Sequence, residues 1–160
     1  MELVRSLPSD VLARYLGDWE WLPGLDGLAP FAVTAFGDVF LTSDDGVWFL
    51  DTIEGRVDRK WDDLDALRAE LDTEDGRSTY LLDGLVDGAL RRGVTPGPDQ
   101  VLTFTVPPVV GGQFEVENIT TLDLLVALSV TGQLHRQVKD LPPGTRISGF
   151  SIADEEPGRE

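Results

Sequence analysis

The chain has 160 residues, of which 41% are apolar, a formal net charge of −16 and no cysteine. The length suits one domain, and the lack of cysteine excludes disulfides, thiolate catalysis and Cys-based metal sites. A surface this acidic repels nucleic acid and anionic membranes, because both are bound through cations. The same charge speeds encounter with a basic partner, although solubility is the simpler interpretation of composition alone.

The start of the chain predicts its location. Residues 1–5 lack the basic start and apolar core of a signal peptide. The longest apolar run, 122–130, contains Asp123 and is too short to cross a membrane. We therefore expect a cytoplasmic protein without a membrane partner.

Short β-rich segments dominate the first half of the chain. Ser9 is a good N-cap, so the apolar spacing that follows predicts a helix over 10–16. The sequence Ser43-Asp44-Asp45-Gly46 predicts a hairpin turn. Together with this turn, an antiparallel meander is predicted from the segments 31–34, 36–42, 47–50 and 56–61.

Helices are predicted more often in the second half. Apolar residues at helical spacing predict one helix over 62–71 and a second over 80–90, which Ser78 would cap and Gly93 would end. The segment 122–130 fits either a strand or the start of a helix that ends near Lys139, and the pattern leaves both open. Strands are predicted over 101–106, 113–117 and 146–152.

This order of elements predicts an α+β fold. We expect an antiparallel β-sheet, made of the meander plus the later strands, with helices packed mainly on one side. Residues 1–153 are expected to form a single domain, followed by an acidic, disordered tail over 154–160.

The usual catalytic motifs are missing from the sequence. There is no G-x-S-x-G elbow, no P-loop and no G-x-G-x-x-G turn. His135 is the single histidine, and we expect it to cap a loop carbonyl or pack on an aromatic ring rather than act as a base. We therefore predict that the chain is not an enzyme and has no catalytic residue, metal site or cofactor.

Carboxylates are concentrated over residues 51–75, where cations are few. The ordinary interpretation is the solvated face of a strand and a helix. The functional interpretation is a surface that docks on a basic protein, for example the cationic groove of a nuclease. The partner-binding candidates are Asp58, Asp62, Asp63, Asp65 and Glu70.

Several blocks of sequence resemble a family of bacterial type VI secretion immunity proteins, at their C-terminal domain. One block is Ala35-Phe36-Gly37-Asp38-Val39-Phe40 with residues 47–51, and the others are residues 107–114, 117–119, 132–138 and 141–145. The resemblance covers about 31–147, while the first thirty residues are more similar to Smi1/Knr4-type immunity proteins. We expect no counterpart of the family's extra N-terminal domain, so the resemblance does not fix the partner.

The resemblance implies a cytoplasmic antidote that binds and neutralises a cognate toxin, in some cases a DNase. The alternative is a stand-alone interaction or regulatory domain with no toxin partner, and the oligomeric state stays open. We expect the family-signature residues to shape the scaffold, because glycines and a turn asparagine more often shape the backbone than bind. They are Phe36, Gly37, Asp38, Gly111, Gly112, Asn118, Gly132, Gln133 and His135.

Overall fold

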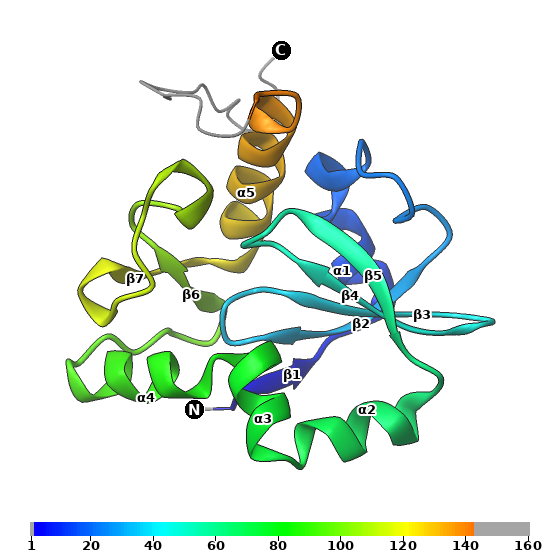
Figure 1. Cartoon of the computed structure of the whole chain (residues 1–160), viewed down its shortest axis with the longest axis horizontal. Helices are drawn as coiled ribbons and strands as arrows, with labels where there is room; N and C mark the ends of the chain where they lie inside the picture. The colour runs from blue at the N-terminus through cyan, green and yellow to red at the C-terminus, as the bar shows by residue number, and fades with distance from the viewer. Residues whose placement is uncertain (1, 143–160) are drawn as a thin grey trace.

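The computed structural model describes residues 2–142. Its main sheet has the order β1-β2-β3-β4-β5: the predicted antiparallel meander forms β2 to β5, and β1 is a further strand that was not predicted (Figure 1). The β3–β4 hairpin turns at Ser43 and Gly46, as predicted. The strands are β1 (Val4–Ser6), β2 (Ala29–Thr34), β3 (Val39–Ser43), β4 (Gly46–Asp51) and β5 (Arg56–Trp61).

The later strands form a second, separate sheet of β6 (Gln100–Phe104) and β7 (Ile119–Asp123). The expected single sheet is therefore divided, and a backbone bond of 2.8 Å from the Leu102 amide to the Ala35 carbonyl links its two parts. The strand predicted over 113–117 is wrong. These residues lie in the β6–β7 loop with two short 3₁₀ helices, η3 (Pro108–Val110) and η4 (Val116–Asn118).

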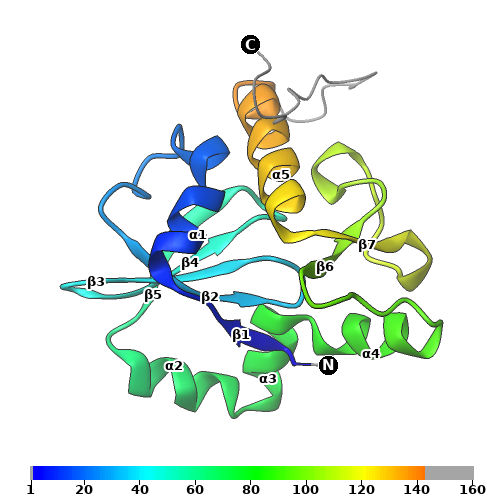
Figure 2. The same cartoon turned by 180° about the vertical axis from the view of Figure 1, so that it is seen from behind.

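Helices cover both faces of the main sheet (Figures 1 and 2). The α+β fold class is confirmed, but the expectation that the helices pack mainly on one side is wrong. The reason is that the strands bury apolar side chains on both faces: Val39 and Leu50 belong to one core cluster, Phe40 and Phe49 to another. The first cluster is covered by α1 (Ser9–Tyr15), η1 (Gly17–Trp19) and α5 (Leu124–Val138). On the other side lie α2 (Leu64–Leu71), α3 (Glu74–Gly76), η2 (Arg77–Leu81) and α4 (Asp83–Arg91).

The helix predicted over 80–90 is broken at Leu82, which has a left-handed backbone with φ of 50°. Before it lies the π-helix η2, and after it α4 begins without a side-chain cap, so Ser78 does not cap this helix. The break has a packing reason. Leu81 joins the core under the main sheet, whereas Val86 and Ala89 pack with the second sheet, so one straight helix cannot serve both.

The open question over 122–130 is resolved by Asp123. Strand β7 ends there and α5 begins at Leu124, because the Asp123 carboxylate accepts a bond of 3.2 Å from the Val126 amide. The strand predicted over 146–152, the tail over 154–160 and the domain limit at 153 lie outside the described residues.

Candidate functional site

A groove of about 510 Å³ lies between the β3–β4 turn and the start of α2. Its lining includes four aspartates, Asp44, Asp62, Asp63 and Asp65, but only one cation, Arg68. We call it the acidic groove. The sheet register creates it: Gly46 and Val47 start β4, Val47 pairs with Trp61 at the end of β5, and the turn therefore faces the residues that follow Trp61.

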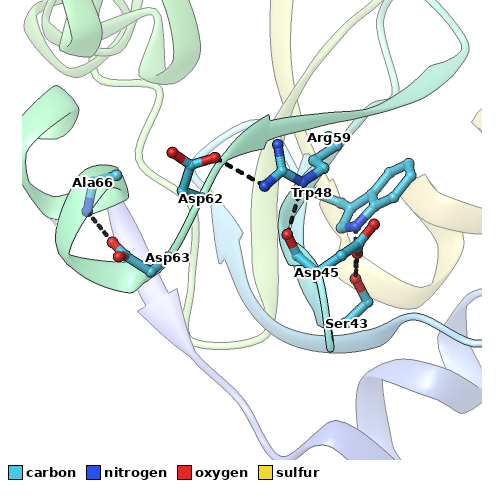
Figure 3. Close-up of polar contacts among 7 residues, drawn as sticks. All are labelled: Ser43, Asp45, Trp48, Arg59, Asp62, Asp63 and Ala66. Atoms are coloured by element: carbon cyan, nitrogen blue, oxygen red, sulfur yellow. Dashed lines mark hydrogen bonds and ion pairs between the residues drawn. The ribbon is translucent and has the colours of Figure 1, made fainter.

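Arg59 joins the two sides of the acidic groove (Figure 3). Its Nε donates to the Asp45 carbonyl at 2.8 Å, and a terminal nitrogen donates to the Asp62 carboxylate at 2.8 Å. Gly46 leaves room for this side chain, since a Cβ at that position would lie 2.7 Å from the Arg59 Nε. The guanidinium therefore fixes Asp62 relative to the turn while neutralising part of its charge.

Asp45 is held as an anion beside the groove. The Trp48 indole donates to the Ser43 hydroxyl at 2.9 Å, and that hydroxyl donates to the Asp45 carboxylate (Figure 3). The bond from Ser43 is the main reason that the pKa of Asp45 lies below its usual value. The turn thus presents a fixed negative charge to solvent.

The remaining groove residues differ in how far they are neutralised. Asp63 caps α2 by accepting from the Ala66 amide at 2.8 Å, and Asp65 pairs with Arg68 at 3.4 Å. Asp44 is exposed and has no ion pair with any residue in 2–142. One apolar side chain, Leu64, is 41% exposed in the groove lining. The structure thus combines unneutralised carboxylates with an apolar contact.

The five predicted partner-binding residues divide into two groups. Asp62, Asp63 and Asp65 line the acidic groove, whereas Asp58 and Glu70 do not. Asp58 lies within β5, 3.5 Å from Arg56, and Glu70 lies on α2, close enough to Tyr80 to raise its pKa together with burial. Sequence reasoning missed Asp44, which lines the acidic groove, and Arg59, which bridges its two sides. Only the strand register brings the turn to the β5–α2 junction, so no local pattern reveals them.

The signature residues around Asp38 lie where β2 turns into β3, at the end of the strands opposite the β3–β4 turn. Phe36 stacks on Phe104 with ring centroids 5.4 Å apart. The buried Asp38 carboxylate accepts from the Thr52 amide at 2.8 Å and the Thr52 hydroxyl at 2.7 Å. Burial, with the nearby Asp51 charge, raises the pKa of Asp38 to about 7. Asp38 thereby ties the start of β3 to the end of β4.

His135 is buried on α5. Its Nε2 lies 2.9 Å from the Thr52 carbonyl and its ring lies 5.6 Å from that of Trp19, centroid to centroid. Burial lowers its pKa. With Phe36 and Gly37 it lines a small cavity of about 30 Å³. On the preceding turn of α5 lie Gly132, whose carbonyl accepts from the Trp21 indole, and Gln133, which bonds to Ser129.

The other signature residues shape the β6–β7 loop. Asn118 accepts from the Val106 amide and donates to the carbonyls of Val106 and Gln113, all within 3.0 Å. Gly111 takes a φ of 102°, and a Cβ on Gly112 would lie 1.6 Å from the Val106 carbonyl oxygen. The closed loop exposes three apolar side chains, Val106 (48%), Val109 (38%) and Phe114 (50%). Whether the signature residues serve only the scaffold stays a prediction.

Two features are absent from the described residues. Within residues 2–142, no three His, Asp or Glu side chains are arranged to hold a metal ion. Over the same residues, no helix has the length and apolar character that a membrane crossing needs.

The fold is α+β, and one of its surface grooves is acidic. Residues 62–135, from the groove to His135, match the family described as T6SS immunity protein Tdi1, C-terminal. This match to a family of type VI secretion immunity proteins confirms the resemblance over those residues. An immunity protein acts by binding and not by catalysis, so the match supports the expectation that the chain is not an enzyme.

One similar solved structure is described as the crystal structure of Atu4351 from Agrobacterium tumefaciens. It aligns with a TM-score of 0.50 and 18% sequence identity, over 82% of this chain and 66% of that chain. This chain thus spans slightly less than two thirds of it, and at this identity the likeness shows a shared fold alone. No similar sequence was found among curated proteins.

Proposed function

We propose that this chain is a cytoplasmic immunity protein that binds and neutralises a cognate basic toxin, with a nuclease as the best fit, through the acidic groove. The family match over 62–135 supports the antidote role. The net charge of −16 supports a basic partner, because a field of that sign accelerates association with a cationic protein. It equally disfavours nucleic acid and anionic membrane as partners.

The geometry of the acidic groove is the observation that supports this groove as the docking site. Four aspartates line it, two of them paired with arginines (Asp62 with Arg59 and Asp65 with Arg68), and the exposed Leu64 side chain offers an apolar contact among them. A nuclease holds phosphates in a cationic groove, which is complementary to such a surface. Docking there would block substrate by occupying the same cations.

The test uses the protein encoded by the adjacent gene as the probe. The wild-type chain is expected to bind it with nanomolar or tighter affinity and to rescue cells that express it. A double variant, Asp44→Lys with Asp65→Lys, should slow association about tenfold and flatten its salt dependence. Asp63 is left unchanged, because its carboxylate caps α2.

The matched control is Asp87→Lys with Asp140→Lys, which makes the same change in net charge. Asp87 pairs with Arg91 on α4 and Asp140 with Lys139, both on the surface. Equal association rates for the two double variants would place the interface outside the acidic groove. A harmless neighbouring protein, or no complex on gel filtration, would contradict the antidote role itself.

The second candidate is a stand-alone interaction domain with no toxin partner. The observation that favours it is the β6–β7 loop, which exposes Val106, Val109 and Phe114. Exposed apolar groups on a closed loop are typical of protein interfaces. In both views this loop lies at the end of the molecule opposite the β3–β4 turn (Figures 1 and 2). Stable binding of a housekeeping protein, lost in Phe114→Ser, would support this candidate.

A further inference from the structure

A second groove lies beside the end of α1, where the loop over 20–28 meets strands β2 and β3. It measures about 560 Å³, which is within the roughly 300–1,000 Å³ of ordinary ligand sites. Its floor is apolar and comes from the helix, the loop and both strands: Leu16, Leu25, Leu28, Pro30 and Leu41. We call it the leucine groove. A hollow lined by apolar side chains and rimmed by polar ones is typical of an interaction site.

The loop wall of the leucine groove is fixed by contacts within the chain. The Trp19 indole donates to the Leu128 carbonyl at 2.9 Å, and the Trp21 indole donates to the Gly132 carbonyl at 3.0 Å. Both bonds tie the start of the loop to α5. Gly27, in the groove lining, has a φ of 82°, which lets the loop turn back toward β2. A partner therefore orders little of this chain on binding, which favours affinity.

The charges of the leucine groove have one sign. Glu20 and Asp26 belong to its lining, and no Lys, Arg or His among residues 2–142 does. Both carboxylates are exposed, and neither has an ion pair with any residue in that range. Arg14 follows Ala13 on α1, but its Nε donates to the Asp10 carbonyl at 3.3 Å and the residue lies outside the lining. The groove therefore attracts cations and repels anions.

The leucine groove and the acidic groove lie on opposite sides of the β3–β4 hairpin. Leu41 lines the first and Thr42 the second, and successive residues of a strand point to opposite faces of the sheet. In both views the loop after α1 lies on one side of the hairpin and α2 on the other (Figures 1 and 2). A partner that clasps the hairpin contacts both grooves.

We infer that the leucine groove binds a cationic amphipathic segment of the cognate toxin. Apolar side chains of that segment pack on the leucines, and its Lys or Arg side chains pair with Glu20 and Asp26. Apolar residues in a pocket supply the larger part of the binding energy, while the charges at the rim fix the register and select the partner. This inference rests on the function proposed above and adds a second contact to it.

The first experiment removes the charges at the rim, with the product of the adjacent gene as the probe. The double variant Glu20→Gln with Asp26→Asn should speed dissociation of the complex about tenfold. The matched control is Glu115→Gln with Asp99→Asn. It removes the same two charges from exposed carboxylates near β6 that also lack an ion pair within 2–142, and dissociation should be unchanged.

The second experiment fills the leucine groove without changing its charge. Ala13 is exposed on α1 and belongs to the lining, so Ala13→Phe places a ring over the apolar floor and should also speed dissociation about tenfold. The control is Ala69→Phe, which adds the same ring to an exposed position of α2 outside both grooves. Thermal unfolding of each variant shows whether the fold is kept.

The outcomes separate this inference from the proposed function. If the wild type binds and both groove variants dissociate at the rates of their controls, the leucine groove is not part of the interface and the antidote role stands. If Ala13→Phe acts but the rim variant does not, the occupant is not cationic and the inference is wrong. Slower dissociation of the rim variant would overturn it as well. If the wild type does not bind, the proposed function fails and the inference fails with it.

Discussion

The Nε2 atom of His135 lies 2.9 Å from the carbonyl oxygen of Thr52, eighty-three residues earlier in the chain. A carbonyl only accepts, so Nε2 carries the proton, and in the neutral ring Nδ1 is left with a lone pair. Thr52 also donates its amide and hydroxyl to Asp38. A single residue at the end of β4 thus connects α5 to the start of β3, and it lies between two groups with shifted pKa values.

Stability should depend on pH through Asp38. Its pKa is raised to about 7 in the folded chain, so between about pH 4 and 7 the native state holds a proton that the unfolded chain releases. This contribution is present at low pH and is lost as the pH rises through about 7. Asp38→Asn should therefore flatten the fall in unfolding free energy between about pH 4 and 7. Denaturant titrations at several pH values measure the unfolding free energy. The same dependence on pH in Asp38→Asn as in the wild type would contradict the prediction.

His135 should act in the opposite direction. Burial lowers its pKa below the unfolded value, so the native state binds fewer protons and stability is lost as the pH falls through about 6.5. His135→Gln should remove this loss below about pH 6.5, while lowering stability at pH 8 through lost packing on Trp19. Denaturant titrations of His135→Gln at these pH values measure both changes in unfolding free energy. A wild-type acid dependence that survives in His135→Gln would assign that dependence to another group.

The β4–β5 turn should tolerate no side chain at Gly55. A Cβ there would lie 2.3 Å from the Nδ1 of His135, and the φ of Gly55 is 77°. Gly27 has a similar φ of 82° with nothing within 4 Å, so Gly27→Ala measures the backbone strain alone, about 1–2 kcal/mol. Gly55→Ala should cost about 1–3 kcal/mol more in unfolding free energy. Equal costs would mean that the histidine side of the contact is free to move.

Asp63 should matter for stability rather than for charge alone. Its carboxylate caps α2 through the Ala66 amide, so Asp63→Ala should lower the unfolding free energy by about 1 kcal/mol. Asp63→Ser keeps a capping oxygen and removes the charge, so it should restore most of that loss. If toxin association slows equally in both variants, the charge of Asp63 also contributes to docking.

Asn118 should hold the β6–β7 loop closed. Asn118→Ala removes three hydrogen bonds, and amide exchange over 105–118 should accelerate while the core strands stay protected. Asn118→Asp keeps the bond accepted from the Val106 amide and should give an intermediate rate. Unchanged exchange in the alanine variant would show that the glycines and prolines close the loop by themselves.

The candidate site was predicted only in part. Asp62, Asp63 and Asp65 come from a local concentration of carboxylates, which the sequence displays directly. Asp44 and Arg59 join them only because Val47 pairs with Trp61, and register is a property of the folded sheet. Tyr80 carries a helical apolar pattern in the sequence, yet it lies in the π-helix η2 and lines a small surface pocket.

By itself, the sequence determined the meander with its hairpin at Ser43–Gly46, the α+β class and the acidic character, because turn chemistry, side-chain alternation and charge are local properties. The tertiary structure alone decided that helices cover both sheet faces, that the later strands form a second sheet, and that the helix predicted over 80–90 bends at Leu82. Each of these depends on which core an apolar side chain joins. That choice is made by residues far apart in the chain, so no local pattern contains it.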